Sequence, residues 1–136
     1  MTMFAQQLAL VFAGAALGWT ALFSFVVAPV SFKDMDTGRA DRHVRRIIKQ
    51  GHGLVALICI CAAVAALLAG AVAGAVIAAM CAVFYIMCQW ALAPRDDPRP
   101  IMGSRKLKTA RVVASGLTAF VMPVLIAMMV LTQMGV

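Results

Sequence analysis

Four cysteines are the residues of this chain with the most specific chemical potential, and all of them lie in one long apolar stretch, at Cys59, Cys61, Cys81 and Cys88. Cys59 and Cys61 do not form a chelating pair on a regular helix, because side chains at i and i+2 point about 200° apart. If the stretch folds into a helical hairpin that turns near residue 71, Cys61 and Cys81 lie at matching depth, about 15 Å from the turn. Cys88 follows Cys81 by one heptad and shares its face.

Thiolate and thioether groups are the ligands that select Cu(I) and similar soft ions. Met80 and Met87 lie beside the cysteines, so the pattern predicts a candidate soft-metal site at Cys61, Cys81 and Cys88. A structural interpretation competes with it and is favoured, because a buried cysteine packs as a small hydrophobe and methionine fills irregular gaps in a core.

The segment RADRHVRRIIKQGHG, residues 39–53, contains both histidines and five of the twelve basic residues. Its apolar residues recur at i, i+4, i+7 and i+8, and its cations occupy other positions. The apolar residues are Ala40, Val44, Ile47 and Ile48, and the cations are Arg39, Arg42, Arg45, Arg46 and Lys49. The pattern predicts a short amphipathic helix that ends near Gly51 and lies in the headgroup layer of a membrane, where each cation contributes about 1 kcal/mol against anionic lipid.

Two other partners of this segment are disfavoured. Nucleic acid is not expected, because no aromatic residue is interleaved with the cations for base stacking. A haem or a histidine-bound metal is not expected either, because His43 and His52 are nine residues apart and no third histidine exists. We interpret both histidines as interfacial side chains, predict no cofactor, and keep a docking surface for another protein as the alternative.

The composition indicates a membrane protein. Hydrophobic residues make up 64% of the 136 residues and charged residues only 12%, the mean hydropathy is +0.97, and glutamate is absent. A soluble domain carries about 25% charged residues. The formal net charge of +7 would suggest an anionic partner in a soluble protein, but here every charged side chain falls within residues 33–51 or 94–111.

The apolar stretches between and outside these segments predict four membrane spans. A span takes about 20 helical residues, and the middle stretch is about twice that length, so it must fold back, and we expect the turn between Gly70 and Gly74. We therefore expect one all-α domain over residues 1–136, an integral membrane four-helix bundle with the interfacial amphipathic helix between spans one and two. The predicted spans are 5–32, 52–69, 73–93 and 110–134. Gly14 and Gly18 are expected to allow close helix packing within the chain.

The positive-inside rule predicts the orientation. Both basic segments lie on the same side of a four-span chain, so we expect 33–51 and 94–111 to be cytoplasmic loops and both termini to be periplasmic. The N-terminus lacks the basic region of a secretory signal peptide, so the first apolar stretch is interpreted as a retained helix. A bacterial cytoplasmic (inner) membrane is the expected location.

The stretches VVAPVSF, residues 26–32, and GRADRHVRRI, residues 38–47, resemble the bacterial membrane family related to transmembrane protein 205. The matching positions are Pro29, Phe32, Gly38 and Arg39, more loosely Arg42 and Arg46, and Pro94 after the third span. The chain departs from the family at residues 47–52, where it has IIKQGH. The resemblance implies a four-helix membrane domain and carries no catalytic mechanism.

The sequence contains no paired carboxylates, no nucleophile with a base and no phosphate-binding loop. It therefore favours a non-enzymatic membrane protein: an accessory or scaffold component, or a homo-oligomer, whose partners are anionic lipid and other membrane helices. The absence of Asp, Glu, Lys, Arg and His from the apolar cores argues against a proton-coupled carrier. Two alternatives remain: a channel or efflux component for a soft metal or an organic cation, and an enzyme with His52, Gln89 or Trp90 at an interfacial pocket.

Overall fold

The structure is a computed structural model, and it describes residues 2–34, 36–91 and 104–136. Every regular element in these ranges is helical, which confirms the all-α prediction. The elements are α1 (Thr2–Leu22), the π-helical turn η1 (Phe23–Val27), α2 (Ala28–Asp34), α3 (Thr37–Leu68), α4 (Val72–Ala91) and α5 (Ser104–Met134). Because α1, η1 and α2 follow one another without a break, the described chain forms four helical rods.

Three of these rods are long and apolar enough to cross a membrane, and they cover Thr2–Ser31, Gly38–Leu68 and Val72–Ala91. The fourth contributes a shorter apolar helix, Thr118–Met134. Many large apolar side chains on their outer surfaces are exposed, among them Val11, Leu57 and Val83. An outside as apolar as the inside is the pattern of a helix bundle surrounded by lipid.

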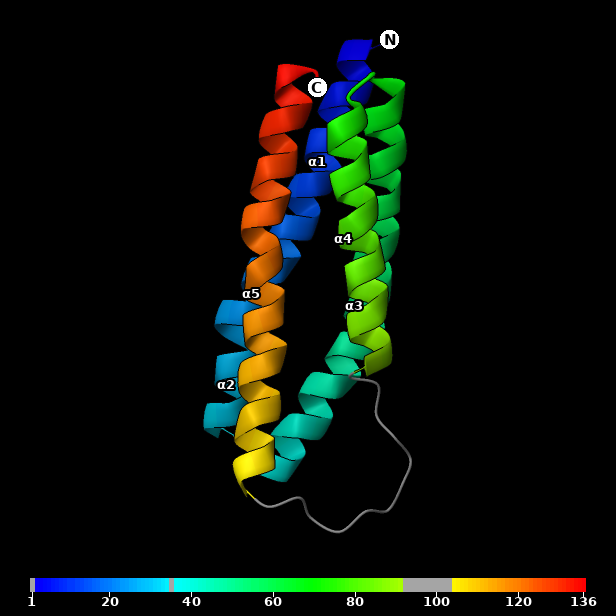
Figure 1. Cartoon of the computed structure of the whole chain (residues 1–136). Helices are drawn as coiled ribbons and strands as arrows, with labels where there is room; N and C mark the ends of the chain where they lie inside the picture. The colour runs from blue at the N-terminus through cyan, green and yellow to red at the C-terminus, as the bar shows by residue number, and fades with distance from the viewer. Residues whose placement is uncertain (1, 35, 92–103) are drawn as a thin grey trace.

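The four rods are arranged as a bundle in which α1 and α4 each pack on both α3 and α5. This places α1 diagonally opposite α4. Both termini and the turn between α3 and α4 lie at one end of the bundle, and α2 lies at the other end (Figure 1). The interior is lined largely by alanine, such as Ala13, Ala66 and Ala78, which lets the backbones approach closely.

The turn between α3 and α4 is built on Gly70, as the sequence predicts. Gly70 has φ of 82°, and the Gly70 and Ala71 backbone N–H groups donate to Leu67 O and Ala66 O. This pair of bonds is the Schellman motif, in which a left-handed glycine closes a helix. Gly74, the other predicted turn residue, instead lies inside α4, where a Cβ atom would meet the Thr132 side chain.

The predicted interfacial helix is not a separate element. Residues 39–49 form the first third of α3, and the helix continues through Gly51 into the predicted second span without interruption. Within the predicted connection 33–51, α2 extends to Asp34 and α3 begins at Thr37. A helix end at Gly51 was expected from glycine's low helix propensity, but this glycine allows a close contact with Trp19 instead.

The other predicted boundaries need smaller corrections. The first rod runs from Thr2 to Asp34 rather than 5–32, and α4 agrees with the predicted span 73–93 as far as Ala91. The fourth helix begins at Ser104, so the second predicted basic loop, 94–111, is helical in its last part, and its residues 94–103 lie outside the described residues.

The first helical rod contains the π turn η1. The Ala28 N–H donates to Phe23 O, five residues earlier, so the turn contains one more residue than an α-helical turn. It ends two residues before Pro29, whose ring would clash with the carbonyl four residues earlier in an α-helix. Two consecutive side chains of this turn, Phe23 and Ser24, are buried.

Candidate functional site

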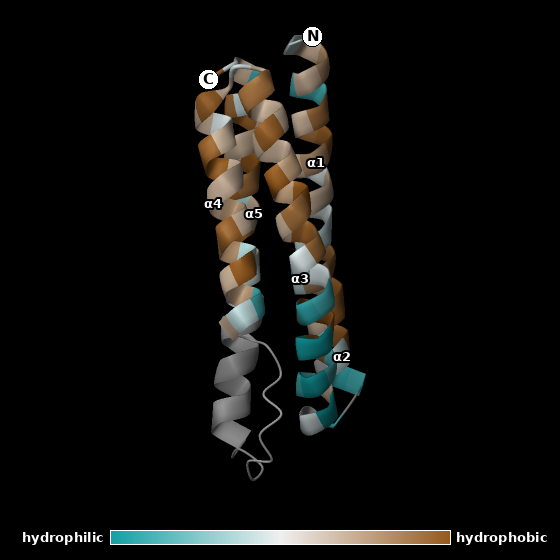
Figure 2. Ribbon diagram, turned by 90° about the vertical axis from the view of Figure 1, so that its right-hand side faces the viewer, coloured by the Kyte–Doolittle hydropathy of each residue, from teal (hydrophilic) through white to brown (hydrophobic). Residues whose placement is uncertain are grey.

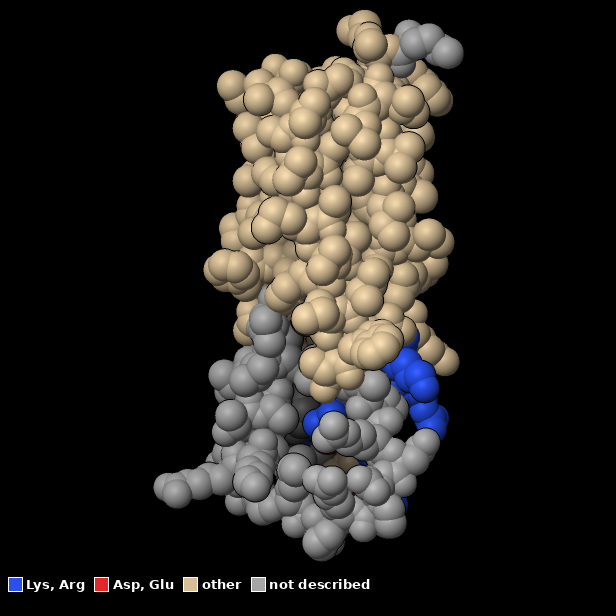
Figure 3. All heavy atoms as spheres, turned by 45° about the vertical axis from the view of Figure 1, so that its right-hand side comes forward, with Lys and Arg blue, Asp and Glu red and all other residues tan. Residues whose placement is uncertain are grey.

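Basic side chains gather at the end of the bundle opposite the termini. Figure 2 shows the hydrophilic colours on α2 and on the adjoining end of α3, below apolar helices. On the face in Figure 3, the Lys and Arg atoms lie at this same end, below a surface without charged side chains. The exposed cations of α3 are Arg39, Arg42, Arg46 and Lys49, and Arg45 is half-buried. We call this group of five the basic end.

The apolar face of the same helical segment packs against other residues of the protein. Ala40, Val44 and Ile48 are buried, and Val44 and Ile48 form one core cluster with Phe23 of the π turn. The sequence analysis assigned this aliphatic face to lipid. It packs instead on the first helix, because α3 is continuous and crosses η1 and α2 before it enters the apolar part of the bundle.

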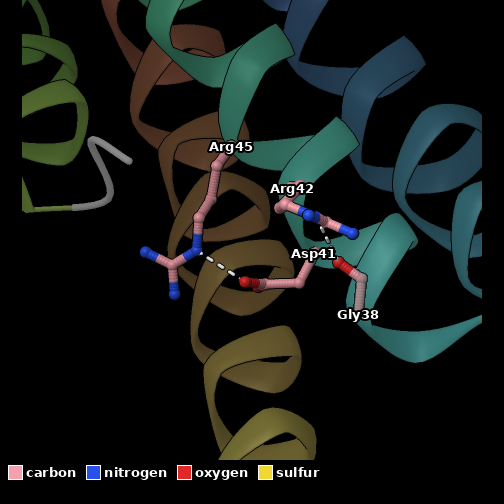
Figure 4. Close-up of polar contacts among 4 residues, drawn as sticks. All are labelled: Gly38, Asp41, Arg42 and Arg45. Carbon is pink, nitrogen blue, oxygen red and sulfur yellow. Dashed lines mark hydrogen bonds and ion pairs between the residues drawn. The ribbon is translucent and has the colours of Figure 1, made fainter. Parts of the chain in front are cut away.

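Two polar contacts order the cations of the basic end (Figure 4). Arg45 Nε donates to Asp41 Oδ2 at 2.8 Å, an i, i+4 ion pair. Arg42 Nε donates to Gly38 O at 3.3 Å. Among the described residues no other ion pair is present at this end, so no carboxylate of these residues balances the guanidinium charges of Arg39, Arg42 and Arg46.

The surface at the basic end is hollowed beside these residues. The hollow measures about 380 Å³ and is lined by Arg39, Arg42, His43 and Arg46. Guanidinium groups donate hydrogen bonds in a rigid fork that matches a phosphate or a carboxylate. The hollow is therefore suited to an anion. The second basic segment does not contribute to this description, because the side chains of residues 104–111 are not described.

The cysteines do not gather as the sequence analysis proposed for a metal site. Cys61 is exposed, whereas Cys81 and Cys88 are buried. The cysteine that joins Cys81 in one core cluster is Cys59. Among the described residues, no three His, Cys, Asp or Glu side chains lie close enough together to hold a metal ion. Met80 and Met87, each 66% exposed, point away from the core that holds Cys81.

A second polar group lies inside the bundle and centres on His52. This histidine, which the sequence analysis interpreted as an interfacial side chain, is buried inside the bundle and only 1% exposed. Its ring packs edge-on against Phe23 and Tyr85, with centroid separations of 5.3 and 5.4 Å. The sequence analysis missed this because it treated residue 52 as the start of a span, whereas α3 has already run for fifteen residues before His52.

A hydrogen bond crosses the centre of the bundle at the same level. Thr20 Oγ1 donates to Ala16 O at 2.7 Å, so Tyr85 OH is the donor in its contact with Thr20 Oγ1. Thr20 belongs to α1 and Tyr85 to α4, the diagonal pair of helices. Both side chains are fully buried. Such a bond fixes the relative rotation of two helices that otherwise touch little.

His52 Nδ1, Trp19 Nε1 and Ser24 Oγ are buried polar atoms that find no hydrogen-bond partner among the residues that the structure describes. Trp19 lies against Gly51, the residue before His52, and Ser24 follows Phe23, whose ring contacts His52. Each unpartnered polar atom disfavours burial by about 1–3 kcal/mol. Polar groups at membrane depth are costly and therefore deserve functional interest, and we call this group the buried polar cluster.

The other residues singled out from the sequence do not line the hollow at the basic end. Gln89 Nε2 donates to Lys49 O at 2.9 Å and so joins the end of α4 to α3. Trp90 is 83% exposed. Of the motif residues, Pro29 lies in α2 directly after the π turn and Gly38 in the first turn of α3, and the side chain of Phe32 is not described.

Searches of family models, curated proteins and solved structures return no match to this chain. The resemblance to the bacterial family related to transmembrane protein 205 therefore stays a prediction.

Proposed function

We propose that this chain is a non-enzymatic integral protein of a bacterial cytoplasmic membrane that crosses it four times and serves as an accessory or scaffold component. Its basic end lies in the cytoplasmic headgroup layer, and both termini are periplasmic. The observation that carries the proposal is the division of the bundle into a long shaft without charged side chains and one basic end. Lys and Arg concentrate on the cytoplasmic side of bacterial membrane proteins.

The attachment of the basic segment to the rest of the protein supports a scaffold role. Because α3 continues from the cations into the apolar shaft, the basic end is a rigid extension of a membrane helix rather than a hinged surface helix. The contact of Val44 and Ile48 with Phe23 holds it against the first rod. A rigid cationic surface that keeps a fixed position relative to the membrane helices is suited to holding anionic lipid or an acidic partner at the membrane.

The test is a topology measurement with paired reporters. Fusions after Val136 are expected to activate a periplasm-dependent phosphatase and to leave a cytoplasm-dependent fluorescent reporter silent. Insertions of the same reporters at Asp36, between α2 and α3, are expected to give the opposite result. A fluorescent fusion at Val136 together with phosphatase activity at Asp36 would overturn the proposed orientation, because the basic end would then face the periplasm.

Soft-metal transport is the weaker alternative, because Cys61 points outward while Cys81 and Cys88 are buried. It is tested by elemental analysis of the protein purified from copper-supplemented cells, beside the Cys61→Ser, Cys81→Ser, Cys88→Ser triple variant. Stoichiometric copper that is lost in the variant would support transport and count against the scaffold role.

A further inference from the structure

The hollow at the basic end is large enough for a small ligand and is lined by basic side chains. Its volume of about 380 Å³ falls within the range of about 300–1,000 Å³ that small-ligand sites occupy. Arg39, Arg42, His43 and Arg46 follow one another at i, i+3, i+4 and i+7, so they share one helix face over about 10 Å. The lining is therefore a continuous cationic strip rather than a scatter of surface charges.

The charge of this strip is not neutralised within the described part of the protein. Asp41 is the only acidic residue there that forms an ion pair, and it pairs with Arg45, which does not line the hollow. Arg42 uses Nε to donate to Gly38 O, which leaves its terminal N–H groups for another acceptor. Arg39, Arg42 and Arg46 together present three guanidinium groups to whatever occupies the hollow.

The strip also continues into an apolar surface. Leu54 and Leu57 follow His43 and Arg46 by eleven residues, which is about three helical turns, so they lie on the same face of α3. Their side chains are 62% and 56% exposed. A ligand with a phosphate group and acyl chains would therefore find the cations and the apolar surface in the correct order along one helix.

We infer that the hollow is a discrete binding site for the phosphate group of an anionic phospholipid, with Arg39, Arg42 and Arg46 as its ligands and Leu54 and Leu57 beneath the acyl chains. The inference rests on the proposed function in one respect: the proposed orientation means that the lipid comes from the cytoplasmic leaflet. Bidentate pairing with guanidinium favours phosphate over other headgroup atoms. The packed face opposite the strip, with Ala40, Val44 and Ile48, prevents the helix from rolling and fixes the strip in place.

The experiment is native mass spectrometry of the full chain in mild detergent, titrated with dioctanoyl phosphatidylglycerol, dioctanoyl phosphatidylcholine or inorganic phosphate. The test variant is Arg39→Gln, Arg42→Gln, Arg46→Gln. The matched control is Lys33→Gln, Arg45→Gln, Lys49→Gln, which removes the same charge from the same end but leaves the lining intact. A third variant replaces the same three lining arginines with lysine, which keeps the charge but not the bidentate geometry.

We expect the wild-type chain to retain one phosphatidylglycerol in preference to phosphatidylcholine. The glutamine test variant should lose affinity by about tenfold or more, the lysine variant by less, and the control by under about threefold. Circular dichroism of each variant checks that its helices are intact. A control variant that loses as much affinity as the test variant would overturn the inference, because the attraction would then be diffuse.

Equal retention of the two lipids would also overturn it, as would binding of inorganic phosphate at least as tightly as phosphatidylglycerol. These outcomes are separable from the proposed function. A basic end that proves periplasmic in the reporter assay would remove the proposed orientation and leave a lining-specific lipid site standing. A cytoplasmic basic end with equal effects of the test and control variants would remove only the site.

Discussion

Replacement of Gly51 with alanine tests the close contact between α3 and the Trp19 ring of α1. An added Cβ atom would lie 2.5 Å from Trp19 Cη2 and 2.9 Å from Cε2, and nearer still to Cζ2. Carbon atoms in favourable contact are about 3.5–4.0 Å apart. The added Cβ atom would therefore approach Trp19 Cζ2 more than about 1 Å closer than this contact distance. Overpacking of this kind costs about 1–3 kcal/mol, and alanine's better helix propensity returns up to about 1 kcal/mol.

We therefore expect Gly51→Ala to lower the free energy of unfolding by about 1–2 kcal/mol, measured by denaturation with SDS in mixed micelles. The matched control is Gly18→Ala in α1, where an added Cβ atom meets no atom within 4 Å, and this variant should be neutral or slightly stabilising. The double variant Gly51→Ala, Trp19→Phe should recover part of the loss, because the smaller ring leaves room. Equal stability of Gly51→Ala and Gly18→Ala would refute the proposed contact.

Three further predictions concern the turn, the crossing hydrogen bond and the cysteines. Gly70→Ala should destabilise the protein by about 1–2 kcal/mol in the same assay, because φ of 82° is unfavourable for a residue with a Cβ atom; Gly116→Ala, at an open position, is its control. Tyr85→Phe should lower the free energy of unfolding by about 0.6 kcal/mol and at most by about 1.7 kcal/mol. In a chain that already carries Thr20→Val, Tyr85→Phe should have no effect, and an equal loss in that chain would show that the hydrogen bond is not its cause. Cys81→Leu should cost about 1–3 kcal/mol in the same assay through overpacking, whereas Cys61→Leu should be nearly neutral, because Cys81 is buried and Cys61 is exposed on the outer surface; equal losses in the two variants would contradict the packing.

The hydrophobic patterning was sufficient to predict four long helices, but not that the amphipathic segment forms one helix with the second of them. Spans are long, uniform in composition and bounded by charged segments, so their existence follows from the energy of placing backbone and side chains in lipid. Gly70 also gave the correct turn, because only glycine adopts its backbone conformation at no cost. The boundaries were less accurate, since an amphipathic segment and an apolar span can join into one helix without any signal in the sequence.

The details of packing could not be predicted from the sequence. Gly14 and Gly18 have the spacing of a close helix contact, but a Cβ atom at either position would meet no atom within 4 Å. Gly51 and Gly74, which the sequence suggested as a helix end and a turn residue, lie at the close contacts instead. In a chain this rich in alanine and glycine, many faces of each helix can pack, and periodicity alone does not choose among them.

The sequence by itself determined that this is an all-α protein with long apolar helices and a concentrated basic segment, because composition and spacing decide which residues tolerate lipid. Only the tertiary structure decided which side of each helix faces inward. Phe23 and Ser24 of the π turn are both buried. A hydrogen bond joins Thr20 to Tyr85 across the diagonal of the bundle. His52 is buried, whereas Cys61 is exposed. These placements depend on the rotation of one helix against another, which arises from contacts between residues far apart in the chain.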